Sequence, residues 1–384
     1  MSFKTIKCSD IIDVRDGTHD SPKYLDKGYP LITSKNIRDN SIDFENVNLI
    51  SEEDYNKINM RSSVKNGDIL MPMIGTVGNP VLVNTNEKFA IKNVALFKLS
   101  ENSEIDGKYF YYLLMSNIIL KQLEKNKRGG TQSFVSLKNL RELKIPYISM
   151  EQQKKIVSFL DKSKGLIDKR KEQIESLDEL VKSRFIEMFG NPVYNPKGWE
   201  MKSLSEIGVL GRGVSKHRPR NASELLGGDY PLIQTGDVAN SGLYIKEYNA
   251  TYSELGLKQS KLWDKGTLCI TIAANIAKTG ILDFDACFPD SVVGFIAGNK
   301  TNNIFMNYWF TSFQKLLEEQ APESAQKNIN LKILNELRVI MPPIELQNQF
   351  ADFVKQVDKL KFEMENSLKE LEDNFNSLMQ KAFK

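Results

Sequence analysis

Hydrogen-bonding side chains gather in short loops of this sequence, and the loops occur in two matching sets. In the first half of the chain the candidate residues are Thr18, His19, Ser34, Lys35, Asn36, Arg38, Thr76, Lys92, Arg128, Thr131 and Gln132. In the second half they are Lys216, His217, Arg218, Gln234, Thr235, Asn275, Lys278, Gln326 and Lys327. Such side chains bind phosphates and pair with the edges of bases, although each alone is also common as a solvated loop residue. Their duplication favours a surface that contacts DNA.

Three motifs come close to catalytic or nucleotide-binding patterns without completing them. Asn191-Pro192-Val193-Tyr194 approaches the Asn-Pro-Pro-Tyr loop of adenine methyltransferases, but it lacks the second proline and directly follows a helix stop. Glu142-Leu143-Lys144 resembles half of a nuclease site, but its repeat at 336–338 ends in arginine and no upstream aspartate is suitably placed. The glycine-rich stretches at 75–78 and 211–213 lack the Lys-Ser or Lys-Thr of a phosphate loop. The sequence therefore predicts no catalytic site.

Composition excludes further classes of protein. The two histidines, His19 and His217, are too few for a histidine-rich metal centre, and the three cysteines lie far apart without a C-x-x-C pair. No metal site and no disulfide framework are expected. With 41% apolar and 26% charged residues, the 384-residue chain has the composition of a globular protein of two domains. Its net charge of +3 is low for a protein that binds nucleic acid unaided.

Signals for membranes and secretion are missing from the sequence. No apolar run reaches the roughly 18 residues of a membrane span. Residues Met1 to Thr5 lead into mixed polar sequence without a secretory core. We therefore expect a cytoplasmic protein without a membrane partner.

The sequence contains an internal duplication. The segment Leu137 to Lys144 recurs 194 residues later as Leu331 to Arg338. The same offset joins Gln153 to Gln347, Phe159 to Phe353, Leu177 to Leu371, Ser183 to Ser377 and Phe189 to Phe383. The front halves match at slightly different offsets, as Tyr29 to Ile32 matches Tyr230 to Ile233. The order is therefore globular unit, long segment, globular unit, long segment.

The two long segments have the pattern of helices. Apolar residues recur every seven positions at Leu160, Ile167, Ile174, Val181 and Met188, and again at Phe350, Val357, Met364, Leu371 and Leu378. Ser149 and Gln152 form a capping box at the first start, and Pro342-Pro343 marks the second start. Each predicted helix has about 40 residues and is roughly 60 Å long. Because so long a stripe needs a partner of equal length, an antiparallel pair within the chain is favoured; a stalk that joins two chains is the alternative.

The sequence predicts both strands and helices in the globular units. Short apolar runs bounded by Gly, Pro and Asn predict strands, and 109–115 and 307–317 predict helices. The aromatic run Tyr109 to Tyr112 is interpreted as core rather than as a platform for stacking bases. The predicted fold class is α+β, with globular domains at 1–149 and 191–343, each followed by a long α-helix at 150–190 and 344–384. The two helices are predicted to pair as an antiparallel coiled coil.

Several stretches carry a resemblance to a known family. They are Leu143-Lys144-Ile145-Pro146 with the following Glu151-Gln152-Gln153, its copy Met341-Pro342-Pro343-Ile344-Glu345, Val14-Arg15-Asp16-Gly17-Thr18-His19-Asp20, Tyr29-Pro30-Leu31-Ile32 and Asn195-Pro196-Lys197-Gly198-Trp199. Together they resemble the specificity subunit of type I restriction-modification systems, over essentially the whole chain. The family usually shows a Pro-Pro-Leu-Glu-Glu-Gln pattern. The first copy has Ile-Ser-Met at 148–150 in place of Pro-Pro-Leu, and the second copy has Leu346 in place of the second glutamate. Both changes remain compatible with a helix start.

The resemblance implies a non-catalytic DNA reader. Each globular unit would be a target-recognition domain for one half of a bipartite, asymmetric sequence, and the helices would fix the length of the unspecified spacer. The implied partners are double-stranded DNA, two modification (methyltransferase) subunits and restriction subunits that translocate and cut DNA. No cofactor is expected in this chain, whereas S-adenosylmethionine, ATP and Mg are expected in the partner subunits. The low net charge is then explained if the partners share the phosphate contacts.

Two other functions remain as alternatives. One is a non-catalytic scaffold whose duplicated units bind proteins. The other is a DNA-binding protein that acts alone, although no helix-turn-helix pattern is apparent and the charge is low for unaided binding.

Overall fold

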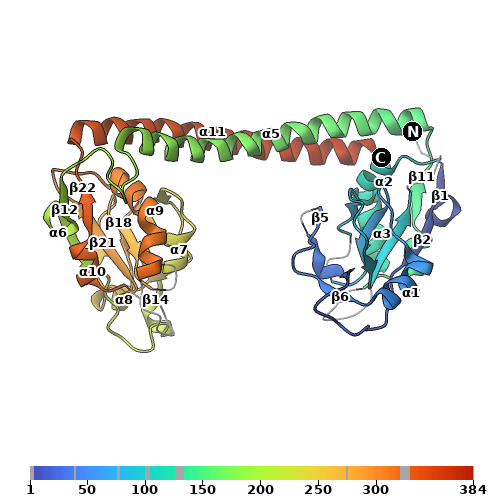
Figure 1. The fold of residues 1–384 in the computed structure, drawn as a ribbon, viewed down its shortest axis with the longest axis horizontal. Coiled ribbons are helices and arrows are strands. Elements are labelled where there is room, and N and C mark those ends of the chain that lie inside the picture. The colour runs from blue at the N-terminus through green and yellow to red at the C-terminus, as the bar shows by residue number, and fades with distance from the viewer. Residues whose placement is uncertain are drawn as a thin grey trace. The chain divides into compact units, whose positions relative to one another are not determined.

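The computed structural model divides the chain into two compact units, which are described separately (Figure 1). The structure describes residues 4–38, 40–75, 78–99, 104–126, 134–273, 276–320 and 329–383, with the backbone alone at 315–320. The first unit comprises Met1–Lys171 and Asn366–Lys384, and the second comprises Glu172–Glu365. Each unit therefore takes one globular part and one half of each long helix. The domain boundaries predicted from the sequence, at 149, 190 and 343, instead separate each long helix from the globular domains. They stay a prediction.

The first unit is built on short, mostly antiparallel strands. Its sheets, in strand order, are β2 (Asp13–Asp16), β10 (Val94–Lys98), β7 (Ile69–Pro72) and β8 (Val81–Leu82); β6 (Asn48–Ile50), β3 (Tyr29–Ile32) and β9 (Ala90–Ile91); β1 (Thr5–Lys7) and β11 (Lys144–Pro146); and β4 (Ile37–Arg38) and β5 (Ser41–Ile42). Only β3 and β9 pair in parallel among these described strands. The helices and 3₁₀ turns are η1 (Cys8–Asp10), η2 (Ser34–Asn36), α1 (Glu52–Ser62), α2 (Gly107–Leu114), α3 (Asn117–Asn126) and α4 (Leu137–Arg141).

The second unit repeats this plan with longer strands. Its sheets are β13 (Gly208–Arg212), β21 (Val292–Ala297), β18 (Leu268–Thr271), β19 (Thr279–Leu282) and β15 (Tyr244–Ile245); β16 (Ala250–Tyr252), β14 (Leu226–Leu232), β20 (Ala286–Cys287) and β17 (Leu262–Trp263); and β12 (Met201–Ser203) and β22 (Arg338–Ile340). The helices are α6 (Leu204–Ile207), η3 (Ser223–Leu225), α7 (Thr235–Ala239), α8 (Glu254–Lys258), α9 (Asn303–Gln320) and α10 (Leu331–Glu336). The predicted α+β class is confirmed.

The central strands are buried on both faces, which explains why they are continuous apolar runs in the sequence. In β7, Ile69 and Met71 pack toward the helices α2 and α3, while Leu70 packs on the opposite face. In β18, Leu268 and Ile270 likewise belong to one core and Cys269 to another. Successive side chains of a strand point to opposite faces, so each sheet is covered on both sides. Tyr109 to Tyr112 are buried in the first core, as predicted.

The long helices α5 (Met150–Phe189) and α11 (Ile344–Ala382) pair in antiparallel fashion, as predicted (Figure 1). In the first unit, the start of α5 packs beside the end of α11, and Lys171 forms an ion pair of 2.9 Å with Glu372. In the second unit, the end of α5 packs beside the start of α11, and Lys361 contacts Asp178 at 2.7 Å. The helices therefore find their partner within the chain, which supports the pair over a stalk between two chains.

A duplicated glutamine fastens each globular domain to its helix. The amide of Gln153 accepts a hydrogen bond from the backbone N–H of Asp106 at 2.7 Å and donates to the carbonyls of Glu104 and Ile148. In the second copy, the amide of Gln347 donates to the carbonyls of Lys300 and Pro342 and accepts from the hydroxyl of Thr301. Both glutamines are buried. Because buried amides must be satisfied, these bonds fix the angle at which the chain enters each helix.

The three cysteines are buried as free thiols. Burial raises the pKa of Cys8 to about 12, and it also raises the pKa values of Cys269 and Cys287. We expect all three thiols to resist alkylation at pH 8 in the folded protein and to react once urea unfolds it, which labelling followed by mass spectrometry measures. Rapid labelling of any of them in the folded chain would contradict the burial.

The same shifts predict how stability depends on pH. Folding holds the thiol protons more tightly, so this contribution is complete below about pH 8.5, the ordinary pKa of cysteine. It is lost as the pH rises through 9 toward the folded pKa of Cys8, about 12. A Cys8→Ala variant, compared with the wild-type chain over pH 8 to 10, should show a smaller fall in the free energy of unfolding.

Candidate nucleic-acid interface

Three segments of the first domain meet at one place, because backbone hydrogen bonds tie them together. The N–H of Thr18 donates to the carbonyl of Ile91 at 3.0 Å, and the N–H of Asn93 donates back to the carbonyl of Thr18 at 3.2 Å. The N–H of Lys92 donates to the carbonyl of Ile32, where β3 ends. We call residues 17–19, 33–36 and 92–93 the first loop site. It brings together the predicted residues Thr18, His19, Ser34, Lys35, Asn36 and Lys92.

The second domain builds an equivalent site on the same backbone framework. The N–H of Val214 donates to the carbonyl of Phe288 at 3.1 Å, and the N–H of Ile233 donates to the carbonyl of Cys287 at 2.8 Å. We call residues 213–221, 233–237 and 288–291 the second loop site. It brings together the predicted residues Lys216, His217, Arg218, Gln234 and Thr235.

A glycine opens each loop site for a steric reason. A Cβ atom at Gly17 would lie 2.1 Å from the carbonyl oxygen of Ile91, and one at Gly213 would lie 2.3 Å from the carbonyl oxygen of Pro289. Real Cβ atoms do not approach a backbone oxygen so closely, so the two chains can meet only where a side chain is missing. The repeated glycine of the sequence therefore marks where the loops are joined.

His19 lies between the side chains of Asp16 and Asn93 in the first loop site. Its Nε2 lies 3.1 Å from the buried carboxylate of Asp16, and its Nδ1 lies 2.8 Å from the side-chain oxygen of Asn93. Arg61 of α1 donates to the other oxygen of Asp16 at 2.5 Å. Asp16 is thus satisfied by two partners while the imidazole stays mostly exposed. The network presents cationic and donor groups at the surface, which suits contact with phosphates or base edges.

Asn36 has an internal role rather than an exposed one. Its side-chain oxygen accepts from the backbone and the hydroxyl of Thr33, and its amide donates to the carbonyl of Asn46 at 2.9 Å. The residue is 5% exposed. Its counterpart Asp237 accepts from the N–H of Gln234 at 2.8 Å in the same capping position. From its residue type, Asn36 was predicted to contact DNA. Its side chain is instead buried and stabilises the loop on which Ser34 and Lys35 lie.

Lys92 of the first loop site makes one further contact, and the other predicted residues lie outside the two loop sites. Arg38 lies at the end of β4 and donates to the carbonyl of Lys35 at 3.0 Å, and Lys92 donates to the hydroxyl of Ser21 at 2.6 Å. Lys278 lies apart from the second loop site, at a cavity of about 310 Å³ lined also by residues of α5, α9 and α11. Thr76, Arg128, Thr131, Gln132, Asn275, Gln326 and Lys327 lie outside the described residues.

The structure adds residues that the sequence did not single out. In the first loop site, Arg61 reaches Asp16 from a helix 45 positions away, so no local pattern marks it. In the second, Arg220 forms an ion pair of 2.6 Å with Asp290. Asn221 lines a cavity beside Gln234, together with Ser215 from the polar segment Ser215-Lys216-His217-Arg218 of the sequence. Arg220 and Asn221 lie within three residues of that segment, so extending it would have found them.

The described residues were also compared with the requirements of a metal site and of a membrane span. No group of three or more His, Cys, Asp and Glu side chains there is placed to hold a metal ion. No helix there combines the length and the apolar character needed to cross a membrane.

The fold defines a class of duplicated protein in which two domains, each with a polar loop site, are combined with a pair of long helices. The family model described as the type I restriction modification DNA specificity domain matches residues 2–177 and 196–373. The chain therefore belongs to the family of type I restriction-modification specificity subunits. It is a non-catalytic subunit with two tandem recognition domains, and its function as a duplicated scaffold unrelated to restriction is not favoured.

Individual relatives agree with this family. The chain is 25% identical over 373 residues to a putative type I restriction enzyme specificity subunit, MjaX, of Methanocaldococcus jannaschii, covering 91% of this chain and 85% of the relative. It is 22% identical over 334 residues to the EcoBI specificity subunit of Escherichia coli, covering 77% and 69%.

Solved structures share the fold. A chain from a structure described as the basis of complex assembly and conformational transition of the type I restriction-modification system superimposes with a TM-score of 0.65. It is 17% identical, and the alignment covers 100% of this chain and 97% of that one. The S subunit of a type I restriction-modification system from M. genitalium superimposes with a TM-score of 0.52 at 16% identity, and the alignment covers 100% of this chain and 96% of that one.

Proposed function

We propose that the two recognition domains read the two halves of a bipartite, asymmetric DNA sequence. The observation that carries this proposal is that the two loop sites share one backbone framework but differ in their side chains. His19 in the first site corresponds to Ser215 in the second, since each stands two residues after the glycine. Ser34 likewise corresponds to Thr235. A common frame with different donors and acceptors suits two domains that read different base pairs.

The partners and cofactors follow from the same proposal. The chain assembles with two modification subunits that bring S-adenosylmethionine and with restriction subunits that use ATP and Mg, and the complex acts on DNA in the cytoplasm. Exposed apolar side chains on the long helices support contact with partner subunits, because large apolar groups in water favour burial. In the first unit these are Phe159 and Leu166; in the second they are Leu180, Ile186, Leu360 and Phe362.

The test of this function is the pattern of methylated adenines in cells. We expect single-molecule sequencing to find methylation at both halves of a bipartite sequence when this chain is present with its modification subunits. Deleting the chain alone should abolish it. Persistence of the same methylation without the chain would refute the proposal, whereas tight, specific DNA binding by the chain alone would favour the stand-alone alternative.

The long helices are proposed to set the length of the unspecified spacer. Inserting one heptad beside Lys171 in α5 and one beside Glu372 in α11, which face each other as an ion pair, should lengthen both helices by roughly 10 Å. A heptad keeps the apolar stripe in register. At 3.4 Å for each base pair, the methylated sites should gain about three unspecified base pairs.

A heptad inserted in α5 alone is the matched control for this experiment. It leaves the two helices unequal, so methylation should fall rather than move to a longer spacer. An unchanged spacer in the double insertion would refute the role of the helices in setting it.

A further inference from the structure

The second loop site contains a cavity of about 240 Å³. Polar residues from three segments line it, among them Ser215, Asn221, Gln234 and Ser291, and the strands β14 and β16 contribute Leu232 and Ala250. Small-molecule sites usually exceed about 300 Å³, so this cavity suits part of a larger ligand, such as the edge of a base pair.

Ser215 is a buried polar residue that lines this cavity. The residue is 7% exposed, and its Oγ makes no hydrogen bond within the part of the chain that the structure describes. Two more buried atoms near Ser215, His217 Nδ1 and Gln259 Nε2, also lack a partner among the described residues. Gln259 contacts the same loop, because its side-chain oxygen accepts hydrogen bonds from the backbone N–H groups of Lys216 and His217. Buried polar groups are nearly always satisfied, and a serine hydroxyl can both donate and accept. Ser215 lines the cavity while His217 and Gln259 do not, so the atoms without a partner lie in the loop that forms and supports the cavity wall.

The first loop site uses the equivalent positions differently. His19, which corresponds to Ser215, is held by Asn93, which corresponds to Ser291 because each directly precedes its sheet strand, β10 or β21. Their ring nitrogen and amide oxygen lie 2.8 Å apart. His19 and Asn93 thus contact each other in the first domain and do not line its cavity of about 200 Å³, whereas the smaller Ser215 and Ser291 line the cavity of the second.

The chemistry of the lining selects among the four base pairs. Guanine is read mainly by arginine or lysine, and cytosine by aspartate or glutamate. Arg220, the only cationic residue that lines the cavity among those described, is held by Asp290 at 2.6 and 2.8 Å, and no acidic residue lines it. Carboxamides pair with adenine, and apolar groups contact the methyl group of thymine. Gln234 and Asn221 supply the former, and Leu232, Ala250 and Tyr252 supply the latter.

We propose that this cavity receives the major-groove edge of an A·T base pair in the half-site that the second domain reads. The inference rests on the proposed function. Gln234 and Asn221 contact adenine, Ser215 forms part of the wall against which the pair lies, and the apolar wall receives the thymine methyl group. The residues thereby determine specificity at one position of the target.

The experiment uses the full chain expressed with its modification subunits and reads methylated adenines by single-molecule sequencing. Three variants probe the cavity: Gln234→Ala, Ser215→Ala and Ala250→Leu, the last of which fills it. Gln234 is exposed, so its replacement tests the idea without disturbing the core. Ser223→Ala is the matched control, because this exposed serine precedes β14 but does not line the cavity. Thermal melting checks that each variant folds.

We expect one position of the second domain's half-site, an A·T pair in the wild type, to accept other pairs. Discrimination there should fall roughly fivefold to a hundredfold, the range for one good contact pair. All other positions and the other half-site should keep their preference, and Ser223→Ala should match the wild type.

Three results would overturn the inference: unchanged preference at every position in the folded variants, relaxation at a G·C position, or a uniform loss of methylation with no change in base preference. Failure of the proposed function is distinguishable, because methylation would then not depend on the chain at all.

Discussion

Exchanging residues 1–149 for the corresponding domain of another specificity subunit is expected to change one half of the methylated sequence and leave the other half unchanged. The bonds that build the first loop site lie within this segment, from Asp16 to Asn93. The second loop site is built within residues 213–291. Since neither site borrows groups from the other, each half-site should follow its own domain.

The junction at 149 is favourable for structural reasons. It keeps β1 and β11, which pair with each other, in the same piece. Among the described residues, the side chain of the buried Gln153 of α5 bonds only to backbone groups, those of Glu104, Asp106 and Ile148. A domain of different sequence but the same backbone can therefore satisfy it.

Sequencing of methylated adenines measures the outcome of the exchange. The control is the reciprocal exchange of residues 191–343, which should change only the other half-site. If either exchange altered both halves, the two domains would not be independent readers.

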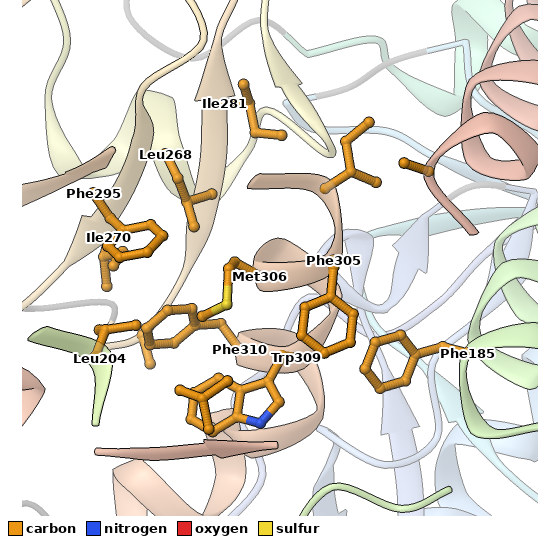
Figure 2. Close-up of a cluster of buried hydrophobic side chains, with 14 of the residues drawn as sticks. Phe185, Leu204, Leu268, Ile270, Ile281, Phe295, Phe305, Met306, Trp309 and Phe310 are labelled. Atoms are coloured by element: carbon orange, nitrogen blue, oxygen red, sulfur yellow. The ribbon is translucent and has the colours of Figure 1, made fainter. Parts of the chain in front are cut away.

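Replacing Phe350 by alanine should destabilise the second unit by about 3 to 5 kcal/mol, the usual cost of removing a large buried ring. Phe350 is 0% exposed. It contacts Phe185 and Phe189 of α5, with ring centroids 5.4 and 5.5 Å away, and Tyr308 of α9 at 5.3 Å. Figure 2 shows Phe185 directed toward Phe305, in the cluster that also holds Trp309 and Phe310. The ring of Phe350, which lies on α11, thus contacts both α5 and the helix α9 of the recognition domain.

Tryptophan fluorescence offers a selective measurement of this effect. Trp199, Trp263 and Trp309 are the three tryptophans of the chain, and all lie in the second unit. Their signal during urea unfolding therefore reports that unit alone. Phe362→Ala on the same helix is the matched control, because Phe362 is 56% exposed and its loss should cost well under 1 kcal/mol. Equal effects of the two substitutions would contradict the proposed role of Phe350.

Helical features were predictable because their signal is local. The heptads of 150–190 and 344–384 require only that residues seven apart share a face, and the structure has helices at Met150–Phe189 and Ile344–Ala382. The repeat supplied each helix with a partner of equal length. Sheet order is not local: β3 pairs in parallel with β9, more than fifty residues away, and no pattern within either strand specifies that pairing.

The candidate site shows the same division. Residue types and their duplication identified the loops that hold His19, Lys35, Arg218 and Gln234, because donors and acceptors can be read from a sequence. They could not distinguish Asn36, whose amide is used inside the loop, from Ser34 beside it. Nor could they associate Arg61 with Asp16.

By itself, the sequence determined that the chain is a duplication of one α+β domain and one long helix, since periodicity and self-similarity are properties of the order of residues. Only the tertiary structure decided which polar side chains meet, which are consumed by burial, and that Ser215 borders a cavity where His19 does not. The physical reason is that hydrogen-bond satisfaction and packing depend on distances between segments far apart in the chain.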